Sequence, residues 1–102
     1  MTHNSPPLRT LRLTLKKQWF DMIASGEKRE EYRAPSKWIL SRLQGKTYDV
    51  IEFTHGYGRQ APRIIVEYRG HSTGTGKPEW GGTGQEVIII HLGNILSRHN
   101  IP

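Results

Sequence analysis

Residues 25–33 hold the densest group of side chains that can do chemistry in this chain. Lys28 and Glu31 place an amine and a carboxylate three positions apart, and Arg33 adds a guanidinium two positions later. A partly desolvated lysine can serve as a general base or nucleophile, and a carboxylate can carry a proton. The same groups can instead meet phosphates and accept a hydrogen bond from the exocyclic amine of cytosine. Both catalysis and binding are therefore open.

A short amphipathic helix over residues 16–24 is predicted just before this group. Trp19, Phe20 and Ile23 fall on one face of such a helix and indicate its buried side. Gly26 then suits the position after the last turn, where a left-handed backbone is easy only for a residue without Cβ. The chain is expected to turn at that glycine.

From Glu27 the chain reads as an extended segment. In a regular strand Glu31 and Arg33 share one face while Lys28 points to the other. If Lys28 still lies in the turn, its long stem brings the ammonium to the side of Glu31 and Arg33. We expect a shared, half-buried pocket, and the alternative is a solvated charged strand whose ion pairs contribute little.

A family resemblance rests on the pattern Gly26-x-Lys28-x-x-Glu31-x-Arg33, preceded by the aromatic pair Trp19-Phe20. This pattern resembles the signature of the ASCH family, and the likeness runs over about residues 11–92. The resemblance implies a PUA-like barrel. It also implies a cleft, lined by the residues at positions 28, 31 and 33, that is expected to hold RNA or a modified nucleobase.

The resemblance also carries an enzymatic alternative. Enzymes similar to this family that deacetylate modified cytidine have a lysine matching Lys28, but a threonine where this chain has Glu31. They use a further carboxylate, for which Glu79 is a candidate. The alternative function is a small hydrolase acting on an acylated nucleoside such as N4-acetylcytidine, or on single-stranded RNA, with Lys28 and Glu31 as catalytic residues. The presence of Glu31 argues against this hydrolase activity, because a carboxylate at that position pairs with the lysine and offers no hydroxyl nucleophile.

Further residues are expected to complete a binding site. Tyr32, Trp38 or Trp80 can stack on a base, and Ser36 and Trp80 are placed at the rim. Trp80 lies in a glycine-rich stretch over residues 70–84 that shows no periodicity, so it either stacks on a base or pins the loop to the domain. Exposed cations are expected to extend an electrostatic track, namely Lys16, Lys17, Arg59, Arg63 and Arg69.

The composition favours a nucleic-acid partner and argues against metal chemistry. Fifteen Lys and Arg against nine Asp and Glu give a formal charge of +6 and a pI near 10.0 over 102 residues, and cations that meet a phosphate backbone release counterions. The chain has no cysteine, and its five histidines show no close ligand spacing. No metal and no cofactor are expected. RNA, single-stranded nucleic acid or a nucleoside or nucleotide is the expected partner, and a protein-interaction module is a third interpretation.

The expected architecture is one small α+β domain. Residues 1–8 read as a flexible N-terminal arm and residues 9–102 as a single ASCH/PUA-like domain. Alternating apolar residues predict strands near 11–15, 49–55, 62–69 and 87–92, and Ser36 is placed to cap a second helix toward Gly45. These elements favour a mixed β-barrel of five to six strands with two or three short helices. The start of the chain lacks the features of a signal peptide, and the longest aliphatic run, 87–90, is too short to span a bilayer, so a cytoplasmic location without membrane contact is expected.

Overall fold

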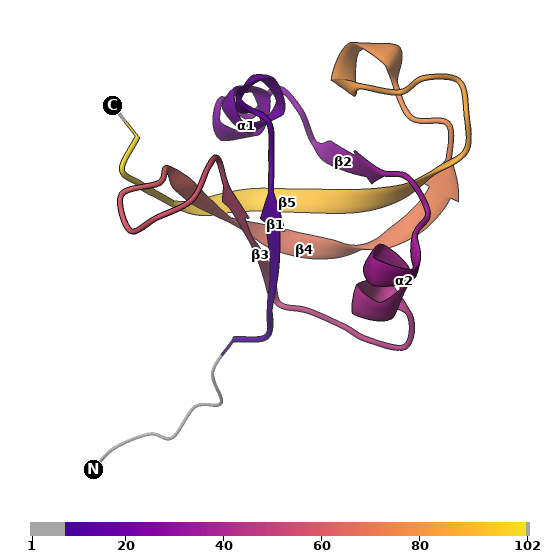
Figure 1. Ribbon diagram of the computed structural model, residues 1–102, viewed down its shortest axis with the longest axis horizontal. Helices are drawn as coiled ribbons and strands as arrows, with labels where there is room; N and C mark the ends of the chain where they lie inside the picture. The colour runs from indigo at the N-terminus through magenta and orange to yellow at the C-terminus, as the bar shows by residue number, and fades with distance from the viewer. Residues whose placement is uncertain (1–7, 102) are drawn as a thin grey trace.

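The protein has an α+β fold in which one mixed sheet curls into a half-barrel (Figure 1). The computed structural model describes residues 8–101, so the predicted arm, apart from Leu8, lies outside the described residues. The α+β class and a barrel-like sheet are confirmed. The elements are β1 (Thr10–Thr14), α1 (Lys17–Ala24), β2 (Glu30–Arg33), α2 (Lys37–Leu43), β3 (Val50–Thr54), β4 (Arg63–Gly74), the 3-10 helix η1 (Pro78–Trp80) and β5 (Val87–His99).

The strands follow the order β1-β3-β4-β5-β2, with β1 parallel to β3 and the other neighbours antiparallel. The sheet therefore begins with β1 and ends with β2. We call the line between these two edge strands the seam. Arg33 on β2 crosses it, because its Nη2 donates to the carbonyl oxygen of Thr14 on β1 at 2.8 Å.

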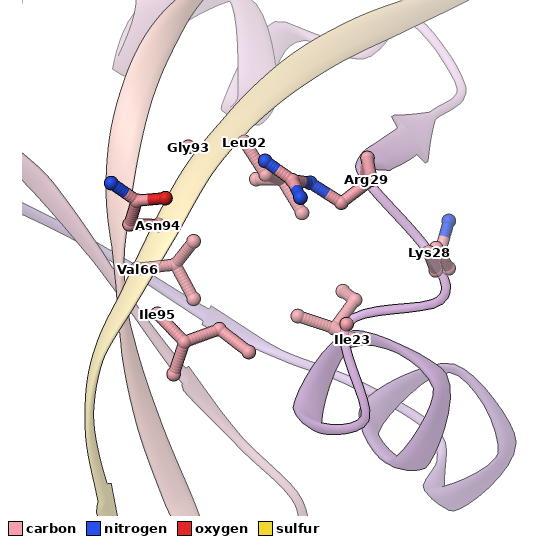
Figure 2. A pocket seen from close by; sticks show the side chains of 9 residues that line it. Ile23, Lys28, Arg29, Val66, Leu92, Gly93, Asn94 and Ile95 are labelled. Carbon is pink, nitrogen blue, oxygen red and sulfur yellow. The ribbon is translucent and has the colours of Figure 1, made fainter.

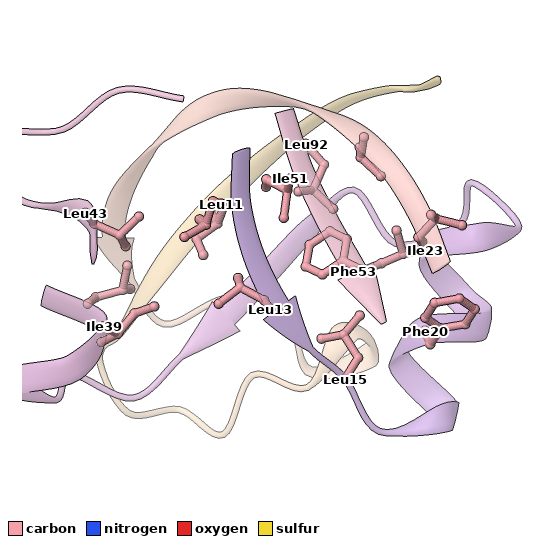
Figure 3. Packing of buried hydrophobic residues seen from close by; sticks show 14 residues of the cluster. Leu11, Leu13, Leu15, Phe20, Ile23, Ile39, Leu43, Ile51, Phe53 and Leu92 are labelled. Atoms are coloured by element: carbon pink, nitrogen blue, oxygen red, sulfur yellow. The ribbon is translucent and has the colours of Figure 1, made fainter. Parts of the chain in front are cut away.

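The core fills the concave side of the sheet, and both helices contribute to it (Figure 3). The alternation predicted for β1 is confirmed, since Leu11 and Leu13 are buried while Arg12 is exposed. Burial of such aliphatic side chains supplies about 1.5–3 kcal/mol each. The buried cluster consists of Leu11, Leu13, Leu15, Phe20, Ile23, Ile39, Leu43, Ile51, Phe53, Ile64, Val66, Ile88, Ile90 and Leu92.

The last two strands are longer than the sequence pattern predicts. The stretch expected to be structureless from Gly70 onward is strand as far as Gly74, where β4 pairs with Val87 at the start of β5. Glycine, serine and threonine hide this pairing, because they carry no hydrophobic alternation. Gly70 has a φ of +91° at a register shift between Tyr68 and His71, so the strand is bulged there.

The sequence pattern likewise does not predict a strand over residues 93–99, the second half of β5. Its start is irregular, with a register shift between the pairs Tyr68–Leu92 and Val66–Ile95. A Cβ on Gly93 would lie 2.5 Å from Nε of Arg69 and 2.8 Å from Oε1 of Glu67. Only glycine leaves room for these two β4 side chains. Beyond it, Ile95 pairs with Val66 and the strand continues to His99.

Candidate functional site

The turn after α1 decides where the lysine of the motif lies. Gly26 has a φ of +88°, as expected for the residue that ends the helix. Its N–H donates to the carbonyl of Ile23 at 3.0 Å, and the N–H of Lys28 donates to that of Met22 at 3.0 Å. Lys28 therefore belongs to the helix-terminating turn, and β2 begins only at Glu30. The side chain of Lys28 is thus released from the alternation of the strand.

The ammonium of Lys28 is enclosed by acceptors. The residue is 1% exposed, and its Nζ donates to the carbonyl of Glu30 at 2.5 Å and to that of Trp80 at 2.9 Å. Oε1 of Glu31 lies 3.4 Å from the same nitrogen. Of the three protons of the ammonium, two go to these carbonyls, and the Glu31 carboxylate is its ion-pair partner. Burial lowers the pKa of Lys28, and the Glu31 carboxylate opposes that shift.

Two aromatic rings flank the same ammonium. Its Nζ lies 4.6 Å from the centroid of Tyr32 and 5.3 Å from that of Trp19. Both distances are within the range of cation–π attraction. The rings thus add to the stabilisation of the ammonium by its hydrogen-bond acceptors.

Glu31 is the centre of the charged cluster. It is 5% exposed, and its Oε2 accepts a hydrogen bond from Nε of Arg33 at 2.9 Å while Oε1 faces Lys28. A buried carboxylate is stable only when cations and hydrogen bonds compensate for its lost hydration. The structure therefore brings together the three side chains that the motif predicted to converge, with the carboxylate between the two cations.

A hollow of about 270 Å³ lies beside this cluster at the seam. It combines the buried carboxylate with a guanidinium, an ammonium and two aromatic rings. Its lining residues are Thr14, Leu15, Lys16, Trp19, Glu31, Tyr32 and Arg33. Such a set offers apolar walls with a few convergent polar groups, the usual composition of a small-molecule site.

Lys28 itself does not line this hollow. Its stem instead borders a smaller pocket of about 110 Å³ between the end of α1 and strands β4 and β5, lined also by Ile23, Val66 and Leu92 (Figure 2). The Lys28 side chain is directed away from that pocket. Lys28 thus acts on the seam hollow through Glu31, whose carboxylate it holds.

Tyr32 connects the site to the loop that follows β4. Its hydroxyl donates to Oε1 of Glu30 at 2.7 Å and accepts from the backbone N–H of Lys77 at 2.9 Å. Burial raises the pKa of Tyr32 to about 12. The hydroxyl is therefore a neutral hydrogen-bonding group at neutral pH and no nucleophile.

The loop over residues 75–84 fits closely over the site, and we call it the glycine loop. A Cβ on Gly76 would lie 2.7 Å from the ring of Tyr32, and one on Gly81 would lie 3.1 Å from the ring of Trp19. The carbonyl of Trp80 holds the Lys28 ammonium, while the Trp80 ring lies 4.3 Å from Nζ of Lys77. Trp80 therefore contributes its backbone to the charged cluster and helps to fasten the loop.

The remaining residues of the predicted site lie apart from the hollow. Ser36 caps α2 as predicted, since its Oγ accepts from the N–H of Ile39 at 3.1 Å. Glu79, the candidate second carboxylate, is exposed in η1. Five cations were expected to form a track, and of these Lys16 lines the hollow. The other four, which are not among its lining residues, are Lys17, Arg59, Arg63 and Arg69.

Trp19 is a site residue that the sequence interpretation assigned to the core. It is half-buried and faces the hollow, whereas Phe20 is 3% exposed in the core. Consecutive residues on a helix differ by about 100° in direction, so two adjacent aromatics cannot share one narrow face. The helix geometry alone therefore indicates that one of the two aromatic residues faces a surface other than the core.

Comparison of this chain with protein-family models, curated proteins and solved structures finds no match. Between residues 8 and 101, no group of three or more His, Cys, Asp or Glu side chains is placed to hold a metal ion. The helices in the same part of the chain lack the length and apolarity needed to cross a membrane. The site is therefore interpreted from its own chemistry.

Proposed function

We propose that this chain is an ASCH-type, PUA-like module that binds RNA or a nucleotide in the seam hollow. The observation that supports this most is the buried Glu31 carboxylate, held between two cations beside the rings of Trp19 and Tyr32. A carboxylate fixed in this way presents an acceptor to an exocyclic amine such as N4 of cytosine. The two rings offer faces on which a base stacks.

The phosphate of the ligand is assigned to the cations at the edge of the hollow. Arg33 is partly exposed; its Nε donates to the Glu31 carboxylate and its Nη2 donates to the Thr14 carbonyl. Lys16 is exposed and lines the same hollow. A guanidinium has five donors, so bonds to these two partners leave others for a phosphate oxygen. Lys28 has a supporting role in this proposal, because it fixes the carboxylate rather than contacting the ligand.

The test is binding of a fluorescently labelled short single-stranded RNA, followed by anisotropy. Arg33→Ala is expected to weaken binding about tenfold, because one charge-assisted contact contributes about 1.5–3 kcal/mol. Glu31→Gln removes the negative charge with little change of shape and is expected to reduce the preference for cytidine over uridine. The matched control is Arg69→Ala, whose guanidinium pairs with Glu67 and does not line the hollow.

Each variant is first shown by thermal unfolding to be folded. Affinity that responds neither to salt nor to Arg33→Ala would contradict the proposal. So would an equal loss of affinity for Arg33→Ala and Arg69→Ala, since the effect would then be that of net charge alone.

Hydrolysis of an acylated nucleoside is the second candidate, and one observation favours it. Burial lowers the pKa of Lys28, which makes the neutral amine needed in a general base more accessible. The glycine loop must open before that amine meets a substrate, because Trp80 covers it. Incubation with N4-acetylcytidine and with single-stranded RNA, analysed by chromatography, tests this function. Turnover that Lys28→Gln abolishes in a folded protein would support it, and absence of product would reject it.

A further inference from the structure

A second hollow, of about 300 Å³, lies at the other end of β1. It lies between the start of β1 and α2. Its volume is at the low end of the range for ligand sites, which is about 300–1,000 Å³. Its lining residues are Thr10, Leu11, Arg12, Trp38, Arg42 and Tyr48. None of them lines the first hollow.

Trp38 gives this second hollow a half-exposed aromatic ring. The inner side of α2 is buried through Ile39 and Leu43, but Trp38 points outward and is 49% exposed. The guanidinium carbon of Arg42 lies 5.0 Å from the centroid of the Trp38 ring. A half-exposed indole next to a guanidinium is the combination on which single-stranded nucleic acids stack their bases.

The charges around this hollow favour an anionic occupant. The Arg12 side chain is 71% exposed, and its Nε lies 3.7 Å from Oε2 of Glu52. An ion pair as exposed as this one contributes little. For Arg42, no carboxylate of residues 8–101 lies within ion-pairing distance. Two cations beside a stacking face match a base with its neighbouring phosphates better than an uncharged apolar partner.

Strand β1 connects the two hollows. Thr10, Leu11 and Arg12 line the second hollow, and Thr14 lines the first. Because a strand rises about 3.3 Å per residue, Arg12 and Thr14 are about 7 Å apart, or about two steps of a stacked nucleic-acid strand. Both residues point to the wet side of β1. A single strand laid along this edge therefore reaches both hollows.

We propose that the second hollow is a further nucleotide subsite, so that the module binds a single strand of several nucleotides along β1 rather than an isolated nucleotide. The inference rests on the proposed function of the first hollow. Trp38 stacks on a base in this arrangement, and Arg12 and Arg42 meet phosphates. The partner defined by this chemistry is a single-stranded RNA or DNA segment.

The experiment compares two ligands, cytidine monophosphate and a cytidine oligonucleotide of about six residues, a length typical of small single-strand sites. Trp38→Ala is expected to weaken binding of the oligonucleotide about tenfold and to leave binding of the monophosphate unchanged. Trp38→Phe, which keeps a stacking face, is expected to restore most of the affinity. Tyr57→Ala is the control, because Tyr57 is 91% exposed and lines neither hollow.

Three results would overturn the inference. Binding of the oligonucleotide that is unaffected by Trp38→Ala would show that the strand does not reach the second hollow. An equal loss for both ligands would place the effect of Trp38 in the shared fold. A polyglutamate peptide that binds as tightly as the oligonucleotide, with the same loss in Trp38→Ala, would assign the surface to an acidic protein partner.

Failure of the proposed function gives a different pattern. If the first hollow does not bind nucleotides, Arg33→Ala leaves the affinity for both the monophosphate and the oligonucleotide unchanged. If only the second hollow is wrongly assigned, the monophosphate binds in an Arg33-dependent way and Trp38→Ala has no effect. The two proposals can therefore fail separately.

Discussion

Among single residues, Lys28 shows how far burial departs from what residue type suggests. Lysine normally keeps its ammonium in water, and here it is as enclosed as the core isoleucines. The sequence motif predicts that the Lys28 ammonium lies on the side of Glu31 and Arg33, and in the structure Glu31 pairs with both cations. It did not predict the enclosure, because the third acceptor is the carbonyl of Trp80, 52 positions along the chain. Contacts of that kind leave no local pattern.

Replacing Lys28 by methionine tests whether this ammonium organises the site. Met fills similar volume, so the cost arises from the carbonyls of Glu30 and Trp80 and from the Glu31 carboxylate, which all lose a donor. Each unpaired group costs about 1–3 kcal/mol, partly offset by relief of the buried charge. We expect Lys28→Met to lower the free energy of unfolding by about 2 kcal/mol in urea titrations.

The control for that substitution is Lys17→Met on the surface of α1. The Lys17 side chain is 72% exposed and pairs with Asp21 at the surface, so its loss should change stability by less than about 1 kcal/mol. Equal stabilities of the two variants would show that the buried ammonium does not hold the site together.

Tyr32 predicts a pH dependence of stability. Its pKa is about 12 in the folded protein against an ordinary value of 10.0, so above pH 10 the folded state keeps a proton that the unfolded state loses. The contribution is present below pH 10 and is lost as the pH rises from 10 to 12. Urea titrations at pH 9 and pH 11 should show a smaller fall in Tyr32→Phe than in the parent protein.

Tyr57→Phe provides the comparison for this measurement. Tyr57 is 91% exposed, so its removal should leave the fall in stability unchanged. A Tyr32→Phe protein that loses as much stability between the two pH values as Tyr57→Phe would contradict the assignment of the effect to Tyr32.

At the scale of elements, the sequence was most informative where hydrophobic period and capping agree. The alternation of Leu11 and Leu13, the cap at Ser36 and the glycine after α1 each specify a local structure, and all three are present. Prediction failed in the second halves of β4 and β5. The second half of each of these strands is held by pairing with the first half of the other strand, and its own side-chain pattern has little part in this.

The glycine loop allows a matched pair of substitutions. Gly76 and Gly84 have φ values of +70° and +87°, so alanine is strained by about 1–2 kcal/mol at either position. Only at Gly76 would the new methyl also strike the Tyr32 ring, which its two hydrogen bonds hold in place. We expect chemical denaturation to show a loss of about 3 kcal/mol for Gly76→Ala and about 1 kcal/mol for Gly84→Ala.

Two outcomes would separate the causes of that loss. Similar losses in both variants would mean that backbone strain alone acts and that the loop is not packed on Tyr32. A larger loss for Gly84→Ala would contradict the contact outright, because no atom of residues 8–101 lies within 4 Å of a Cβ at that position.

For the whole molecule, the incomplete closure of the sheet explains why both hollows lie where they do. The sheet starts at β1 and ends at β2, and the side chain of Arg33 bridges them instead of a strand ladder. Side chains, not backbone pairs, therefore line this edge, and the helices α1 and α2 flank it at opposite ends of β1 (Figure 1). Composition predicted an excess of positive charge but could not place it, since the placement depends on this topology.

The salt dependence of binding measures how much of that charge meets the ligand. A single strand contributes a slope of about −0.7 in log K against log salt for each phosphate that is neutralised. If Arg12, Arg33 and Arg42 each meet one phosphate, the slope for a short oligonucleotide is about −2, and Arg42→Ala reduces it to about −1.4. Anisotropy titrations between about 50 and 200 mM salt measure this.

Arg69→Ala separates local contact from net charge in the same titrations. It removes one positive charge, as Arg42→Ala does, but from a residue that pairs with Glu67 and lines neither hollow. The slope should then stay near −2, because counterions are released only where a cation meets a phosphate. Equal changes of slope in the two variants would mean that the strand binds the basic surface without a fixed path, and the edge of β1 would lose its assigned role.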